Sequence, residues 1–164
     1  MKRSHISWLA VLPSLLLVSA CGEKEAAPTA KTNKPLGAAC MGPAGIPRTP
    51  SPVGAQVFFI TPVSGDIVSS PVELEFGLSG MEVAPSGDDR PDSGHHHIIV
   101  DSELPLLSLP IPKDDLNVHF GDGRTKTALT LAPGEHTLQL LLGDYLHIPH
   151  DPPLFSKQIR ITVE

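Results

Sequence analysis

Three consecutive histidines, His95–His97, are the residues of this chain best suited to chemistry. They follow Gly94 and lead into the apolar run Ile98–Val100. Four more histidines follow before residue 151: His119, His136, His147 and His150. Imidazole titrates near neutral pH and is the commonest biological metal ligand. The density of histidines therefore predicts either a metal site or a buried polar network.

Strand parity divides the triple histidine. Residues two apart in a strand share a face and lie about 6.5–7 Å apart. His95 and His97 therefore share one face, and His96 shares the other with Ile98 and Val100. If the face of Ile98 and Val100 is the core, His95 and His97 project outward or toward a neighbouring strand. Two imidazoles so placed can chelate one ion, with a further ligand from another strand or loop.

Candidates for the remaining ligands lie downstream. His136 begins a predicted strand on its core-facing side, and Pro149 and Pro152 stiffen the loop that carries two more histidines. His119, beside a predicted turn, is interpreted as a surface or cross-strand residue. Two carboxylates are assigned as acceptors that orient ligating histidines. The predicted metal ligands are His95, His97, His136, His147 and His150, and the predicted orienting acceptors are Asp101 and Asp144.

Imidazole ligands suit copper or zinc, and we expect binding to weaken below about pH 6 as the rings protonate. A blue-copper centre is not predicted, because it needs a thiolate and Cys40 lies outside the predicted domain. The alternative to a metal is a hydrogen-bonded network. Its members would be His95, His97, Asp101, His136 and His147, and His136 alone could be a strand-end histidine bonded to backbone.

Enzyme signatures are sparse. The sequence contains no Gly-x-Ser-x-Gly, no His-Glu-x-x-His and no phosphate-cradling glycine loop. No catalytic residue and no organic cofactor is assigned, and a non-enzymatic role in metal handling or sensing is favoured. Two alternatives stay open: an immunoglobulin-like structural or interaction module of the cell envelope, and a metalloenzyme with an open coordination position.

The elements that must position the histidines are short strands. The chain has 18 Pro and 14 Gly and is only 4% aromatic, which disfavours a helical bundle. Apolar residues alternate with polar ones between turn residues, which indicates about seven strands. An all-β, immunoglobulin-like antiparallel β-sandwich over residues 55–164 is therefore predicted. The expected strands are 57–60, 72–78, 96–100, 118–120, 126–131, 135–142 and 157–163.

Three segments together resemble a known bacterial family, domain of unknown function 4399. They are Gly94–His97, the segment Pro133-Gly134-Glu135-His136-Thr137-Leu138, and Gly143-Asp144 followed by His147 and His150. The resemblance covers roughly residues 94–163. The family has no settled activity, so the resemblance implies a site without naming its chemistry.

The first 54 residues are predicted to deliver and tether the domain. Lys2 and Arg3, an apolar run and small residues before Cys21 are typical of a lipoprotein signal over residues 1–20. Cys21 is then the lipidated residue, and residues 21–54 form a flexible Pro- and Ala-rich tether in which Cys40 has no assigned role. By resemblance to lipoproteins of Gram-negative bacteria, Gly22 favours passage to the outer membrane over retention at the inner one. A net charge of −6 disfavours nucleic acid as a partner, and the protein partner is not predicted.

Overall fold

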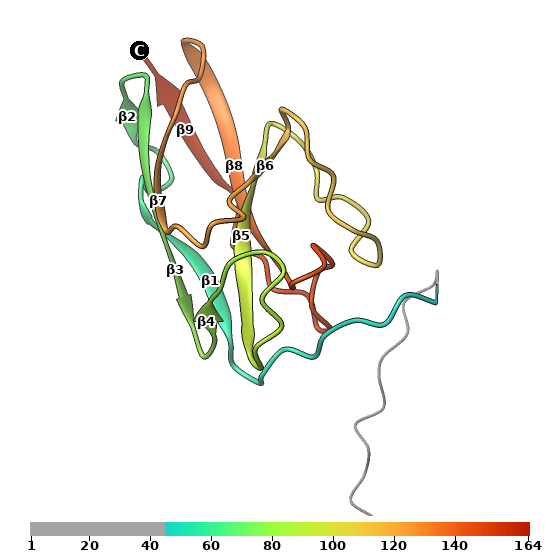
Figure 1. The fold of residues 1–164 in the computed structure, drawn as a ribbon. Coiled ribbons are helices and arrows are strands. Elements are labelled where there is room, and N and C mark those ends of the chain that lie inside the picture. The colour runs from blue at the N-terminus through green and yellow to red at the C-terminus, as the bar shows by residue number, and fades with distance from the viewer. Residues whose placement is uncertain (1–44) are drawn as a thin grey trace, which may run out of the picture. The chain divides into compact units, whose positions relative to one another are not determined.

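The computed structural model describes residues 45–164, and within them the chain is all β. The predicted signal, Cys21 and Cys40 lie outside the described residues. Two sheets face each other (Figure 1), and no helix that could span a bilayer occurs in the described part. Nine strands are present: β1 (Gln56–Thr61), β2 (Ile67–Val68), β3 (Val72–Ser79), β4 (Glu82–Val83), β5 (Ser93–Val100), β6 (Asn117–His119), β7 (Lys126–Leu129), β8 (Gly134–Gly143) and β9 (Ile159–Val163).

The smaller sheet has the order β1-β3-β7, and the larger has the order β2-β9-β8-β5-β4 with β6 also paired to β5. The pairs are antiparallel except β2 with β9 and β4 with β5. All seven predicted strands are confirmed. The two strands that the pattern missed, β2 and β4, are two residues long each, too short for alternation to show.

The main core fills the space between the sheets. β3 shows the expected alternation, with Val72, Leu74 and Phe76 buried and the intervening Glu73 exposed. Leu138 and Leu140 of β8 and Ile98 of β5 contribute to this core from the opposite sheet. The prediction that Ile98 and Val100 face the core is therefore confirmed.

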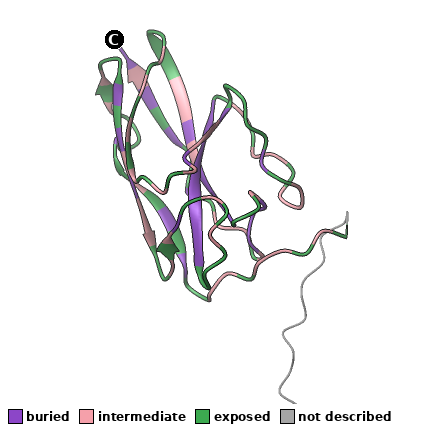
Figure 2. Cartoon of the chain, viewed as in Figure 1, coloured by how far each residue is buried: buried purple, intermediate pink, exposed green. Residues whose placement is uncertain are grey.

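A second, smaller core lies on the outer face of the larger sheet. Ile99 and Leu141 project to this side, and the crossing between β5 and β6 lays Ile111, Leu104 and Leu107 over them. Consequently all eight residues of β5 are buried, on both faces (Figure 2). The outward face of the triple histidine is thus covered by a loop and does not meet solvent.

The ordered structure also extends upstream of residue 55. The last part of the predicted tether contacts the loop after β8, and Pro50 forms an isolated bridge with Asp151. Residues 48–51 therefore belong to the packed domain.

Candidate metal centre

Strand β5 supplies two histidines to one site. His95 and His97 face outward, opposite Gly143 and Leu141 of β8 respectively, and both are fully buried. Their ring centroids are 4.8 Å apart. His96 points the other way, into the main core, where its ring lies 4.7 Å from that of Phe76. The predicted split into an outward pair and an inward single histidine holds.

Strand β6 supplies the third. His119 pairs directly with His97 across the antiparallel ladder, and the two ring centroids are 5.0 Å apart. One ligand atom from each of His95, His97 and His119 can be chosen so that all three lie within 4.8 Å of one another. His119 is a cross-strand residue, as interpreted, but it was left out of the predicted ligand set. Its role depends on pairing between β5 and β6, which a sequence pattern does not disclose.

The loop after β8 supplies a fourth histidine. Nε2 of His147 lies 3.0 Å from Nε2 of His119 and 3.1 Å from Oγ of Ser86. The His147 ring centroid is 4.8 Å from that of His95. His147 adopts a φ of 64°, a left-handed conformation that is uncommon outside glycine and must be held by its surroundings.

Asp144 holds that loop in shape. Its buried carboxylate accepts backbone hydrogen bonds from Leu146 and Ile148, each at 2.9 Å, through Oδ1. The backbone N–H of His147 donates to the Asp144 carbonyl, also at 2.9 Å. Asp144 thus acts on His147 through the backbone, rather than on a ring nitrogen as predicted.

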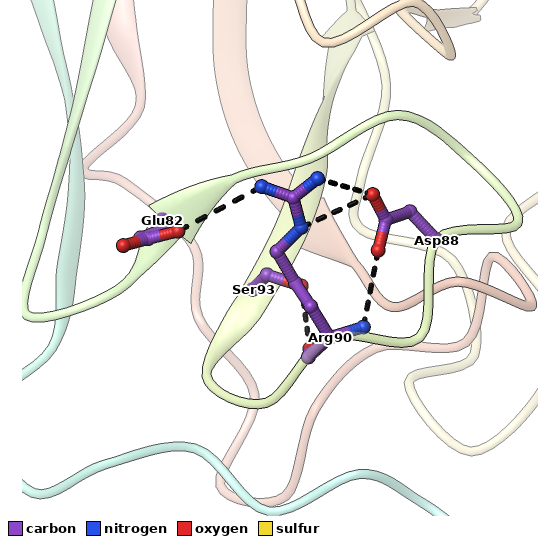
Figure 3. Close-up of polar contacts among 4 residues, drawn as sticks. All are labelled: Glu82, Asp88, Arg90 and Ser93. Carbon is purple, nitrogen blue, oxygen red and sulfur yellow. Dashed lines mark hydrogen bonds and ion pairs between the residues drawn. The ribbon is translucent and has the colours of Figure 1, made fainter.

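The loop between β4 and β5 closes the site beside Ser86. Figure 3 shows that Arg90 bridges Asp88 and Glu82, and that Ser93 Oγ donates to the Arg90 carbonyl at 2.8 Å. The backbone N–H of Ser86 donates to the carbonyl of Gly121 at 2.9 Å. These contacts fix the loop that brings the Ser86 hydroxyl to His147.

Two glycines permit the close packing of these rings. A Cβ on Gly143 would lie 2.9 Å from Cε1 of His97, and a Cβ on Gly121 would overlap the ring of His119. Real Cβ atoms do not approach other atoms this closely. The site therefore depends on glycine at both positions.

The cluster has unsatisfied polar atoms. Neither ring nitrogen of His95 or His97 has a hydrogen-bond partner, and the same holds for His96 in the main core. A buried polar group without a partner costs about 1–3 kcal/mol, so such groups are rare and call for a specific explanation. An ion held by the ring nitrogens is one such explanation.

Burial also keeps these rings neutral. Desolvation, assisted by His147 and His119, lowers the pKa of His95 to about 3. Desolvation together with His95 and His119 lowers the pKa of His97 to about 2. The pKa of His119 is also lowered, first by desolvation and then by His147. Neutral imidazole is the form that binds a metal ion.

Two of the predicted ligands lie elsewhere. His136 contacts Asp101 through Nδ1 at 2.6 Å and donates through Nε2 to the Ala132 carbonyl at 2.8 Å. His150 is buried with Nε2 donating to the Ser93 carbonyl at 3.1 Å. Asp101 also accepts the backbone N–H of Thr137 at 2.7 Å. Asp101 therefore orients His136, as a carboxylate partner would, but neither contacts the four-histidine cluster.

The donor set suits a tetrahedral metal ion in type, and one pair of nitrogens suits it in spacing. Zinc–nitrogen bonds of about 2.0–2.1 Å in tetrahedral geometry place neighbouring nitrogens about 3.3 Å apart. The 3.0 Å separation between the His119 and His147 nitrogens is close to that value.

The fold and the site together define a β-sandwich domain with a covered four-histidine cluster on the outer face of its larger sheet. The chain belongs to the family described as Domain of unknown function (DUF4399), whose family model matches residues 74–164. The match includes all four histidines and begins twenty residues before the segment that carried the resemblance in sequence. No curated protein and no solved structure matches the chain significantly.

Proposed function

We propose that this domain binds a transition-metal ion, copper or zinc, through His95, His97, His119 and His147. The observation that carries the proposal is the convergence of three ligand atoms within 4.8 Å, one each from His95, His97 and His119 on two adjacent strands. Two of these rings, His95 and His97, are buried and lack hydrogen-bond partners. Buried imidazoles without acceptors are costly in a purely structural role. An ion would occupy one nitrogen of each ring.

The role is metal handling or sensing rather than catalysis. Two of the four ligands are fully enclosed, and the other two are half-buried. Such enclosure suits retention of an ion more than repeated access of a substrate to an open coordination position. His119 also lines a groove of about 580 Å³ beside β6 and the end of β7.

The site is proposed to act in the periplasm. The charged, apolar and small-residue segments before Cys21 support export and lipid attachment at that cysteine, and Gly22 supports delivery to the outer membrane. The segment between Cys21 and Arg48 would then set the distance of the domain from the lipid surface.

Elemental analysis of the purified protein tests the proposal. We expect about one equivalent of copper or zinc after reconstitution and dialysis, and loss of that equivalent in His119→Ala. His119 is half-buried, so this substitution leaves a smaller cavity than one at His95 or His97. His136→Ala, a histidine outside the cluster, is the matched control and should retain the metal. Equal metal content in wild type and His119→Ala would refute the proposal.

A hydrogen-bonded structural role is the second candidate. The contacts from Ser86 to His147 and from His147 to His119 favour it, because they form a continuous polar chain without an ion. This candidate predicts no bound metal in any variant. It also predicts that His119→Ala lowers the free energy of unfolding equally with and without added zinc.

A further inference from the structure

Residues Arg48–Ser51, here called the strap, are fixed to the loop after β8 along its whole length. Arg48 donates through Nε to the Pro149 carbonyl at 3.0 Å and through its terminal nitrogen to the His150 carbonyl. It also pairs with Asp151 at 3.4 Å, and only 10% of its side chain is exposed. Arginine side chains so deeply buried on backbone carbonyls are rarely incidental surface contacts.

Backbone hydrogen bonds continue the attachment. The Asp151 N–H donates to the Thr49 carbonyl at 3.0 Å, and the Ser51 N–H donates to the Asp151 carbonyl at 3.3 Å. The Ser51 hydroxyl donates to the Pro152 carbonyl at 2.8 Å. The strap therefore runs as a short extra strand beside the loop that bears His147.

One contact links the strap directly to the histidine site. Thr49 Oγ1 donates to Asp144 Oδ2 at 2.8 Å. Asp144 is only 2% exposed, and its other oxygen caps the backbone of Leu146 and Ile148, which flank His147. The Thr49 hydroxyl thus holds one oxygen of a buried carboxylate, and the other oxygen of that carboxylate holds the backbone N–H groups on either side of His147.

We propose that the strap is a positioning element of the metal site, which acts through Thr49 and Asp144 to hold His147 toward the ion. This inference rests on the proposed function and adds to it a residue and a means of control. With the strap seated, His147 completes the ligand set. With the strap displaced, the site keeps only His95, His97 and His119.

The conformation of His147 makes it the ligand most easily lost. A non-glycine residue in the left-handed region is strained and keeps that conformation only where neighbouring contacts hold it. Those contacts are the Asp144 cap and a hydrogen bond from the Ile111 N–H to the His147 carbonyl at 2.8 Å. Without the Thr49 hydroxyl, Asp144 Oδ2 loses its partner and the cap weakens.

Thr49→Val and Thr49→Ser in the full chain test the inference. Valine keeps the size of threonine but removes the hydroxyl, whereas serine keeps the hydroxyl. We expect Thr49→Val to bind zinc about 10–100-fold more weakly, as loss of an orienting partner typically does, and Thr49→Ser to bind like wild type. Ser51→Ala, which removes a strap contact that does not reach Asp144, is the control and should also bind like wild type.

A spectroscopic readout separates positioning from general stability. Cu(II) bound to wild type should give the electron paramagnetic resonance signature of four nitrogen ligands, and Thr49→Val the signature of fewer. A merely destabilised protein would keep the wild-type signature in its folded fraction. An unchanged zinc affinity or an unchanged copper signature in Thr49→Val would overturn the inference.

A double variant tests whether Thr49 acts on the metal site through His147. In a His147→Ala background Thr49→Val should have no further effect on zinc affinity, because the residue through which it acts is gone. If the two substitutions reduced zinc affinity additively, the claim that the strap acts through His147 would be overturned. If wild type itself binds no zinc or copper, the proposed function fails and this inference fails with it, whereas binding that ignores Thr49 refutes the strap alone.

Discussion

Acidification of the metal-free protein should destabilise it steeply between about pH 6.5 and pH 4. The cause is the set of fully buried histidines, whose pKa values burial lowers to about 3 for His95, about 4 for His96 and about 2 for His97. In the unfolded chain each returns to an ordinary value of about 6.5. Unfolded protein therefore binds more protons than folded protein throughout this window, and stability falls as pH falls.

The magnitude follows from linkage. Between about pH 7 and pH 5, a histidine that stays neutral when folded and titrates at about 6.5 when unfolded reduces the free energy of unfolding by about 2 kcal/mol. The three histidines of β5 together contribute about 6 kcal/mol, against a typical domain stability of about 5–15 kcal/mol. Carboxylates add little here, because their ordinary pKa values lie near 4.

Urea unfolding at pH 7 and pH 5, in the presence of a chelator, measures the effect. His96→Leu is the sharpest variant, because His96 lies in the main core beside Phe76 and outside the metal cluster. Its pH dependence should be smaller than that of wild type by about 2 kcal/mol, whatever its stability at pH 7. An unchanged difference between the two pH values in His96→Leu would show that these buried rings do not govern the acid response.

The low pKa values also change the expected pH profile of metal binding. The sequence suggests metal binding that weakens below about pH 6, but the buried rings of His95 and His97 stay neutral in the folded protein and have no proton to release at that pH. Protonation of these two rings should therefore not weaken metal binding to the folded protein between pH 7 and pH 5.

Two further predictions concern the surroundings of the site. Gly121→Ala should weaken zinc binding, because the added Cβ overlaps the His119 ring. Competition with a chromophoric chelator measures the affinity. Gly77→Ala, which places a Cβ 2.6 Å from the ring of Phe58, is the matched control and should bind zinc like wild type. Equal zinc affinity in Gly121→Ala and wild type would contradict the placement of His119. The Asp101 carboxylate raises the pKa of His136, so this pair stabilises the protein below the ordinary histidine pKa and loses its effect as pH rises through the raised value. His136→Gln should therefore lower stability at pH 5.5 more than at pH 8.5 in urea unfolding, and an equal loss at both would refute the ion pair.

Period-two patterning was sufficient to predict the sandwich and the direction of each β5 side chain, because parity is a local property of a strand. The covering of the outer face was harder to foresee. Ile98, Ile99 and Val100 place apolar side chains on both faces of the strand, a pattern typical of strands buried on both sides, and leucines recur through the following crossing. These two signals together could have predicted the second core.

The composition of the site was only partly predictable. His95, His97 and His147 were assigned correctly to the cluster. His136 was assigned from its place at the start of a strand and His150 from its proline-rich loop, and the structure places both on other partners. His119 joins the cluster through the pairing of β5 with β6. Thr49 is connected to the cluster only through its contact with Asp144, which lies 95 residues further along the sequence. Long-range pairings of this kind leave no periodic trace.

The burial of β5 on both faces has a kinetic consequence. Amide protons of a strand sealed between two cores exchange only when the whole domain opens, whereas a loop held by one carboxylate and a strap opens in smaller excursions. In the proposed metal site, His95 and His97 would then be the fixed half and His147 the half that we expect to move. The rate at which an ion leaves would then be set by how often the loop from Asp144 to His150 lifts, and not by the breathing of the sandwich.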